Sequence, residues 1–453
     1  MNAKSTKNIF ILEDEMNKRI SLLLLIAILL GSLGVSAVSA QDATDLSLWV
    51  FVDRHGLFMQ NQAARWNEVN PDRPINLTYE QIDYTQMHDN LLASLLVGMG
   101  APDLADIEIS KFATFTKGDI QLIELDDAIE PYRGDIIETR LAPYVANGHN
   151  YGIDYHLGSF VMYYNTGILS AAGVDVDSIR TWDDYIEAGK KVTQDTNGDG
   201  TPDVYMASVE TSGVMTARGI MLMMGGGAYD AEGNLILNSE ANVKALQFVQ
   251  DLVHVHGIAR PTSGGEHHSP DHFLDLVEGR IASLWMPQWY MTRFPDNMSS
   301  QLAAVEVIRP MPIFEEGGYT TTMGGGTGTA ITNQIDPSKI ELAKEFLAFA
   351  KLTYEANVAL WTDLGFDPMR VDVYDDPALL ITMDDFSGEV PFEYIKAGLA
   401  NVAPEYTGPY YPEIATIMQT TMMYELIENK KSPQEVLDAA IAELQAMGAD
   451  VGG

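Results

Sequence analysis

Residues 148–203 read GHNYGIDYHLGSFVMYYNTGILSAAGVDVDSIRTWDDYIEAGKKVTQDTNGDGTPD, and the order of parts in this stretch organises the rest of the chain. The apolar runs 151–155 and 160–164 predict two short strands with a break at Gly158. A short helix is expected near residues 168–172. Thr181 is the expected N-cap of a longer helix, because the carboxylates of Asp183 and Asp184 favour the positive end of the helix dipole.

The residues before this stretch predict a parallel sheet. Apolar runs at 46–52, 75–79 and 104–109 alternate with helical patterns, including one over 84–97, which is typical of strands joined by helical crossovers. Ligands of such sheets bind beyond the carboxyl ends of the strands. This rule singles out Asp53 and Arg54 after the first strand, and Glu108 and Ser110 at the end of the third.

The N-terminus predicts export. Lys18 and Arg19 precede an apolar run at 20–33, and the sequence AVSA at 37–40 offers a small-residue cleavage site. We therefore expect residues 1–40 to be a leader and signal peptide, with Met16 as the true start and a mature, soluble, periplasmic or extracellular chain. The sequence contains no cysteine, which excludes disulfides, thiolate metal sites and a lipid anchor through an N-terminal cysteine.

Length and charge narrow the class of protein. A chain of 453 residues is too long for one compact core and fits two lobes. Its 64 acidic and 27 basic residues give a formal net charge of -37. Such a surface repels nucleic acid and anionic membranes, so neither is an expected partner.

Several short motifs occur in one order along the chain. They are Ala101-Pro102-Asp103, Gly148 with Tyr151 and Gly152, Tyr163-Tyr164-Asn165, and Thr181-Trp182-Asp183-Asp184. Together they resemble the extracellular solute-binding proteins of ATP-driven importers that carry sugars and oligosaccharides. The resemblance covers residues 46–447. It implies a two-lobe, type II periplasmic-binding-protein-like α/β fold, in which each lobe is a sheet flanked by helices and a hinge joins residues 41–153 plus 318–368 to residues 154–317 plus 369–453.

The resemblance also implies a function. The chain would be the exported, monomeric substrate-binding component of an ABC transporter, closing around a mono- or oligosaccharide and docking on a membrane permease. It would need no cofactor and perform no chemistry. Two alternatives stay open: the same fold binding a glycerol phosphate or polyol, and a secreted carbohydrate-active enzyme. No motif singles out a catalytic carboxylate pair.

Sugar recognition needs flat aromatic side chains and directional polar groups. The resemblance places the stacking aromatics at Trp285, Trp289, Tyr410 and Tyr411. It places polar contacts at Asp53, Arg54, Glu108, Tyr155 and His156, with Asp367 in a crossing between the lobes. The alternative for a tryptophan at a strand end is core packing, and for His156 the two interpretations are balanced.

Three further motifs concern metal or phosphate. Oxygen ligands alternate as in the start of a calcium loop at Asp195, Asn197, Asp199, Thr201 and Asp203, but the twelfth position is Met206 and not glutamate. We predict a structural calcium site there, with a charged surface turn as the alternative. The histidine-rich segment 266–272 offers zinc ligands by residue type, although we favour a loop entering a helix. The glycine-rich segment 320–328 lacks the lysine of a P-loop, so we expect close backbone approach of the hinge and of a ligand edge.

Overall fold

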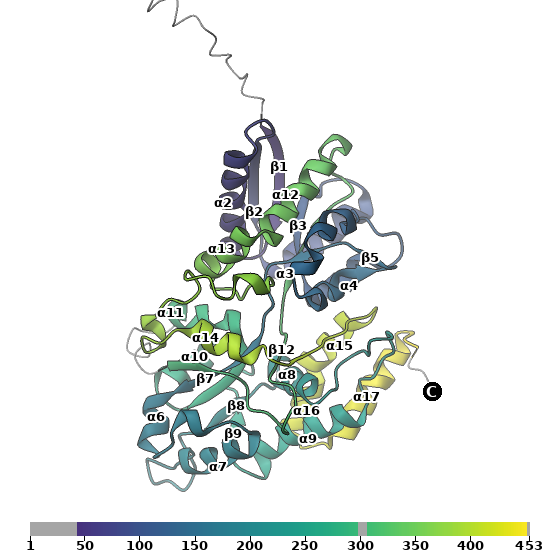
Figure 1. Cartoon of the computed structure of the whole chain (residues 1–453). Coiled ribbons are helices and arrows are strands. Elements are labelled where there is room, and N and C mark those ends of the chain that lie inside the picture. The colour runs from purple at the N-terminus through teal and green to yellow at the C-terminus, as the bar shows by residue number, and fades with distance from the viewer. Residues whose placement is uncertain (1–42, 298–305, 451–453) are drawn as a thin grey trace, which may run out of the picture.

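The computed structural model describes residues 43–297 and 306–450, which form two lobes joined by crossings of the chain (Figure 1). The predicted leader and signal peptide, residues 1–40, lie outside the described residues. Within the described ranges, no helix combines the length and apolarity needed to cross a membrane.

Lobe 1 is built on a five-stranded sheet with the order β2-β1-β3-β13-β6. These strands are β1 (Thr44–Val50), β2 (Ile75–Gln81), β3 (Leu104–Glu108), β6 (Ile153–Asp154) and β13 (Thr327–Ile331). The predicted parallel arrangement is confirmed for β1, β2 and β3. The sheet is nevertheless mixed, because β13 pairs antiparallel with β3 and with β6.

Helices cover the lobe 1 sheet (Figure 1). They are α2 (Asp53–Val69), α3 (Tyr84–Val97), α4 (Ile109–Phe115), α5 (Asp126–Ile129), α12 (Ile340–Leu352) and α13 (Tyr354–Leu364), and a small hairpin adds β4 (Val145–Ala146) and β5 (His149–Asn150). The bounds of α3 match the sequence prediction. Its ends are set locally, because the Asp83 side chain accepts bonds from the backbone of the first turn and Gly98 ends the helix with a left-handed φ of 80°.

Lobe 2 is built around three antiparallel strands in the order β10-β7-β11. Its strands are β7 (Phe160–Asn165), β8 (Ala207–Val209), β9 (Ala259–Pro261), β10 (Ser283–Pro287), β11 (Glu306–Arg309), β12 (Thr321–Thr322) and β14 (Val402–Ala403). Every residue of β7 and β10 is buried. These strands therefore read as continuous apolar runs rather than alternating ones.

The helices of lobe 2 are α6 (Thr166–Ala171), α7 (Trp182–Val192), α8 (Met215–Met223), α9 (Glu240–His254), α10 (Pro270–Val277), α11 (Arg293–Asn297), α14 (Pro391–Gly398), α15 (Tyr411–Ile417), α16 (Met423–Ile427) and α17 (Pro433–Ala446). The predicted cap of α7 is confirmed: Thr181 Oγ1 accepts a bond of 3.1 Å from the Asp184 backbone N–H, and the Asp184 carboxylate accepts one of 2.9 Å from the Thr181 N–H. A capping interaction of this kind stabilises a helix by about 1 kcal/mol.

One predicted lobe boundary differs from the strand pairing. Residue 318 was the expected start of the second lobe 1 segment, but β12 pairs with β14, which keeps Thr321 and Thr322 in lobe 2. The chain enters lobe 1 only at β13, after Gly324, Gly325 and Gly326. The prediction placed the boundary early because a two-residue strand carries no periodic signal.

Candidate functional site

A pocket of about 140 Å³ lies between the lobes. Figure 1 shows α4 of lobe 1 facing α8 and α15 of lobe 2 at this place. Lobe 1 contributes Tyr84, Glu108 and Ser110, which stand at the start of α3, the end of β3 and the start of α4. Lobe 2 contributes a longer wall, whose polar members are Arg218, Glu405, Tyr411 and Gln419.

Glu108 is the centre of the lobe 1 wall. It precedes α4 as the N-cap, and its Oε2 atom accepts bonds of 2.9 Å from the Ser110 N–H and 3.0 Å from the Tyr84 hydroxyl. Burial raises the pKa of Glu108, and the bonds from Ser110 together with the charge of Arg218 offset part of that rise. The carboxylate is thus held in a fixed direction at the carboxyl end of a parallel strand.

His88 holds the backbone of Glu108. The Glu108 backbone N–H donates to His88 Nε2 at 3.1 Å, and His88 Nδ1 lies 2.7 Å from the Tyr84 carbonyl oxygen. Burial lowers the pKa of His88 to about 4, so the ring is neutral near pH 7. A neutral ring that accepts at Nε2 and donates at Nδ1 fits both of these contacts.

An ion pair forms the polar part of the lobe 2 wall. Arg218 Nε donates to Glu405 Oε1 at 2.6 Å, and Nη2 donates to Oε2 in a bidentate arrangement. Tyr411 OH donates to Glu405 Oε1 at 2.7 Å, and its ring lies 5.6 Å from the guanidinium carbon. Two of the five N–H donors of arginine are used in the pair, so the guanidinium retains donors for a ligand.

The rest of the lobe 2 wall is apolar and rich in methionine. Its larger side chains are Val214, Met215, Met221, Leu222, Leu237, Ile414 and Met418, and Gly227, Ala228 and Ala415 complete it. Met418 begins a π-helical turn, Met418–Met422, that joins α15 to α16. Methionine side chains are flexible and polarizable, which suits a wall that packs against the C–H groups of a ligand.

A contact between the lobes lies at the lip of the pocket. Lys117, which follows α4, makes a 2.8 Å ion pair with Glu413 of α15. The Lys117 ammonium also lies 5.5 Å from the ring centre of Tyr410. This lip joins the two lobes beside the pocket.

Three of the predicted ligand residues line the pocket, namely Glu108, Ser110 and Tyr411. Tyr410 lies at the lip and is half-buried. The prediction missed Tyr84, Arg218 and Glu405. A signal existed for Arg218, because a single arginine in the apolar helix sequence MTARGIMLM needs a buried partner.

Other predicted ligand residues lie away from the pocket lining. Tyr155 and Trp285 are 0% exposed. The Tyr155 hydroxyl donates to Asp106 inside lobe 1, and the Trp285 indole donates to the Thr216 carbonyl inside lobe 2. The prediction is corrected for these two, because both rings are packed in the cores of their lobes. Asp53 and Arg54 are exposed at the start of α2, where Asp53 accepts a bond from Tyr79.

Asp367 and His156 belong to the crossings between the lobes. Asp367 is 1% exposed and accepts 2.8 Å bonds from the backbone N–H groups of Gly158 and Ser159. His156 Nδ1 lies 3.7 Å from Asp367, and burial lowers the pKa of His156 to about 3. Numbered in chain order, the first crossing includes Gly158 and Ser159, the second includes Gly324, Gly325 and Gly326, and the third includes Asp367. Asp367 therefore ties the third crossing to the first.

A second buried carboxylate ties the first crossing to the second. Asp154 pairs with Arg140 at 2.8 Å and accepts backbone bonds from Tyr155 and from Thr327. Arg140 also donates to the Gly325 carbonyl at 2.6 Å. We call Asp154 and Asp367 the hinge carboxylate group, since together with Arg140 they contact all three crossings.

The glycines of the second crossing are required by close packing. A Cβ atom on Gly326 would lie 1.9 Å from Arg140, and Gly326 has a φ of 138° that other residues rarely adopt. This confirms the expected close approach at the hinge. Trp289 covers the same segment: it is half-buried, and its indole donates to the Gly324 carbonyl at 2.9 Å. A ligand contact of Trp289 stays a prediction.

The predicted calcium motif forms an exposed loop, and the histidine-rich segment forms a partly buried one. In the predicted calcium loop, Asp195 accepts backbone bonds from Gly198 and Gly200, and Asp203 accepts from Thr196. Asn197, Asp199 and Thr201 lie in the same exposed turn, and calcium binding there stays a prediction. The histidine-rich segment enters α10 as we favoured, with Ser269 capping the helix through the His272 N–H.

The two carboxylates of the lining, Glu108 and Glu405, each accept hydrogen bonds from side chains of their own lobe, which fix their orientation. The fixed acceptors lie on lobe 1, and lobe 2 carries both the fixed arginine and the adaptable apolar wall. This combination is typical of a binding site. Because the walls come from different lobes, a ligand here contacts both.

Comparisons with known proteins identify the family. The profile of the family described as bacterial extracellular solute-binding protein matches residues 53–353. An arabinooligosaccharide-binding protein of Halalkalibacterium halodurans is 41% identical over 409 residues, covering 90% of each chain. One of Bacillus subtilis is 37% identical over 440 residues, covering 94% of this chain and 99% of that one.

A solved structure shares the fold. The binding protein associated with an ABC transporter of B. animalis subsp. lactis, in complex with beta-1,6-galactobiose, aligns with a TM-score of 0.70 at 20% identity. The alignment covers 90% of this chain and 98% of that chain, which confirms the predicted two-lobe, type II fold. The chain therefore belongs to the bacterial extracellular solute-binding protein family, whose members bind solutes and are not enzymes.

Proposed function

We propose that this chain binds arabino-oligosaccharides in the pocket between its lobes and delivers them to the membrane permease of an ABC transporter. The observation that carries the proposal is the pairing of two fixed polar walls, Glu108 on lobe 1 and Arg218–Glu405 on lobe 2, across one pocket. The two arabinooligosaccharide-binding relatives, which align over at least 90% of this chain, supply the sugar class.

The chemistry of the walls supports a neutral polyhydroxyl ligand. Sugar hydroxyls both donate and accept, so they fit a carboxylate acceptor facing guanidinium donors. A glycerol phosphate fits less well, because Arg218 is already neutralised by Glu405 and Glu108 adds negative charge. An arabinofuranose ring is puckered, and a flexible methionine-rich wall adapts to such a surface more readily than a rigid aromatic platform.

Binding would stabilise the closed arrangement of the lobes. A ligand that contacts both walls favours the closed form by its differential affinity for the two forms. The permease would then recognise the closed form. We expect the binding protein to act as an exported monomer, which size-exclusion chromatography with light scattering measures directly.

The test is a calorimetric titration of residues 41–453 with arabino-oligosaccharides of increasing length, arabinose, maltodextrins, polyols and glycerol phosphate. We expect saturable binding of the arabino-oligosaccharides and weaker binding of the others. Binding of a polyol or maltodextrin with no response to arabino-oligosaccharides would overturn the sugar class. A response to none of these compounds would overturn the carbohydrate assignment.

A further inference from the structure

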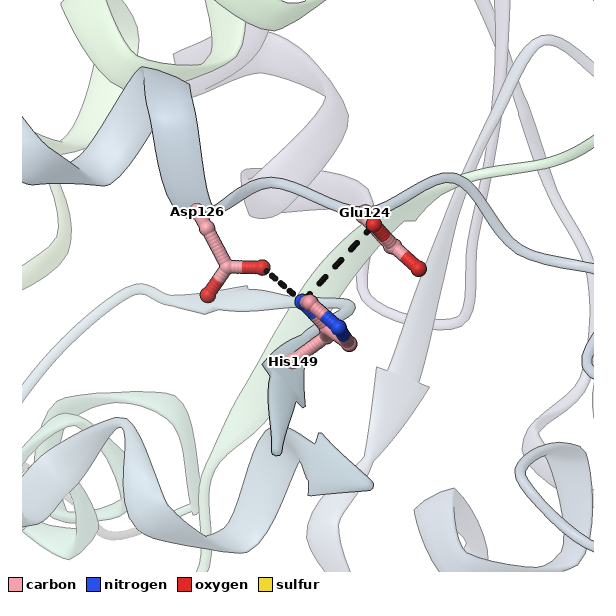
Figure 2. A group of neighbouring side chains, drawn as sticks. All are labelled: Glu124, Asp126 and His149. Carbon is pink, nitrogen blue, oxygen red and sulfur yellow. Dashed lines mark hydrogen bonds and ion pairs between the residues drawn. The ribbon is translucent and has the colours of Figure 1, made fainter. Parts of the chain in front are cut away.

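Three metal-ligating side chains meet on lobe 1, and none of them lines the pocket. Glu124 and Asp126 flank Leu125 at the start of α5, whose first residue is Asp126, and His149 stands on β5 (Figure 2). Their ligand atoms all lie within 4.8 Å of one another. His149 Nδ1 lies 2.9 Å from Asp126 Oδ2 and 3.7 Å from Glu124 Oε2. Figure 2 shows the imidazole placed between the two carboxylates.

The backbone holds the two segments in register. The Leu125 N–H donates to the Asn150 carbonyl at 2.8 Å, and the Leu125 side chain is buried with 0% exposure. With Leu125 turned inward, its two neighbours turn outward toward His149. The three ligating groups are thus brought together by strand-like pairing and not by chance contact of long side chains.

Each carboxylate is oriented by a residue that follows His149. Asp126 Oδ1 accepts the Asn150 N–H at 3.2 Å, and Glu124 Oε1 lies 3.4 Å from the Tyr151 hydroxyl. In both cases the second oxygen is the one that points to His149 Nδ1. Hydrogen bonds that fix one oxygen and leave the other for the ion are the pattern found around protein metal ligands.

The distances fit a small transition-metal ion. Ligand atoms placed about 2.0–2.2 Å from a tetrahedral Zn²⁺ lie roughly 3.4 Å from one another. The two separations from His149, 2.9 and 3.7 Å, lie on either side of that value, and the two carboxylates lie within 4.8 Å of each other, so modest side-chain movements suffice. The side chains are between 36% and 54% exposed, which leaves room for water to complete the coordination shell.

Arg133 is the cation already near the group. Its Nη2 atom lies 3.8 Å from Asp126 Oδ1, the oxygen turned away from His149, and its other nitrogens pair with Glu130 and Glu138. The guanidinium therefore does not stand between the three ligating atoms.

We propose that Glu124, Asp126 and His149 bind a divalent first-row transition-metal ion, for which Zn²⁺ is the probe. One imidazole nitrogen with two carboxylates suits Zn²⁺, Co²⁺ or Ni²⁺ and disfavours Ca²⁺, which prefers oxygen ligands alone. The ion would link β5 to the segment before α5 and so stabilise that edge of lobe 1.

The test is a titration of residues 41–453 with ZnCl₂ at pH 8, followed by calorimetry and by the visible absorption of bound Co²⁺. We expect one saturable site, a Co²⁺ spectrum of low coordination number, and no displacement by excess Ca²⁺. His149→Ala should weaken Zn²⁺ binding at least tenfold, as should Glu124→Gln and Asp126→Asn, which keep the side-chain shape. His256→Ala removes a partly exposed histidine elsewhere and should leave binding unchanged.

Two results would overturn the proposal. One is a wild-type chain that takes up no Zn²⁺ at 100 μM or so, which would leave the three residues as an ion pair of protonated His149 with two carboxylates. The other is unchanged Zn²⁺ affinity in His149→Ala, which would place the ion elsewhere on an acidic surface. Tyr151→Phe separates orientation from ligation: it should lower the Zn²⁺ affinity several-fold without altering the melting temperature of the metal-free chain.

Discussion

The pocket and the hinge both place carboxylates at the boundary between the lobes, but they use them differently. In the pocket, Glu108 and Glu405 bind side chains of their own lobe and border open volume. In the hinge, Asp154 and Asp367 are at most 1% exposed and bind backbone N–H groups of crossing segments. A carboxylate that holds backbone from several crossings is a structural fixture, whereas one held within a single lobe stays available to a ligand.

The difference shows why residue type alone does not identify a ligand contact. Asp367 and Glu108 are both acidic, both near a crossing or strand end, and both predicted from the sequence as ligand residues. The structure separates them by their partners, since Asp367 bonds to Gly158 and Ser159 while Glu108 faces the pocket. The variants below are chosen to test whether this separation holds in solution.

The largest effect is expected from Arg140→Met. The change leaves the buried Asp154 carboxylate without its cation, and breaking a buried pair on one side costs about 3–5 kcal/mol. Urea unfolding followed by circular dichroism measures the loss. Lys244→Met removes an exposed ion pair with Glu240 and should cost less than about 1 kcal/mol. If both variants lost the same small amount, the hinge carboxylate group would not be a structural fixture.

A smaller effect, on affinity, is expected from Glu108→Gln. The amide keeps an acceptor for Ser110 but lacks the charge, and a hydrogen bond to a charged group contributes about 1.5–3 kcal/mol. Calorimetry with the arabino-oligosaccharide should therefore show weaker binding and little change in unfolding free energy. Asp53→Asn, at an exposed position off the pocket lining, should bind as the wild type does. If Asp53→Asn weakened binding and Glu108→Gln did not, the binding site would lie near the start of α2.

Lowering the pH should reduce the sugar affinity of the wild-type chain before it unfolds the chain. Burial raises the pKa of Glu108, so its charged form, the better acceptor, is lost as the pH falls through a value above the usual range of glutamate. That protonation favours the folded state, so the loss of affinity is not a loss of folding. Burial would raise the pKa of Asp154 as well, but the charge of Arg140 and its other partners lowers it overall.

The stability that Asp154 contributes is therefore present above its unfolded pKa and is lost only as the pH falls through its lower folded value. Calorimetric affinity and melting temperature, measured together over a series of acidic buffers, give the order of the two events. We expect the affinity to fall first, and Glu108→Gln to lack that early fall. Simultaneous loss of affinity and folding would contradict the prediction.

The smallest effect is expected at the lip. Lys117 and Glu413 are 41% and 30% exposed at their side chains, and such pairs contribute about 0.2–1 kcal/mol. A double-mutant cycle with Lys117→Ala and Glu413→Ala, read as sugar affinity, should give a coupling energy in that range. Zero coupling would mean that the lip does not favour the closed form, and a coupling of several kcal/mol would make it part of the binding site.

Much of the fold was predictable because its signals are local. Periodicity gave α3 with its observed bounds, and the Thr181 cap followed from three residues. Part of the pocket was predictable because ligands bind at strand ends: Glu108 is the last residue of β3, and Ser110 follows it. The two-residue strand β12 was not predictable, since its pairing with β14 depends on residues about eighty positions away.

Two of the aromatic predictions, Trp285 and Tyr155, failed for a different reason. Trp285 stands on β10, whose residues are all buried, and Tyr155 packs on His55 at a ring distance of 4.3 Å. Tryptophan and tyrosine serve cores and sugar sites equally well, so their type does not distinguish the two. Arg218 was missed because its partner, Glu405, is distant in the sequence. The arginine inside an apolar helix indicated a buried partner but did not identify it.

The π-helical turn at Met418–Met422 offers a route for evolutionary change. A π turn holds one residue more than the α-helical repeat, and each residue of an α-helix advances the side-chain direction by about 100°. Here Met418, the first residue of this turn, lines the pocket, while Met423 and Leu426 pack in the core after it. A descendant that loses one residue in this turn would rotate one wall of the pocket relative to α16 while keeping the lobe packed. New sugar preferences can arise there without refolding the protein.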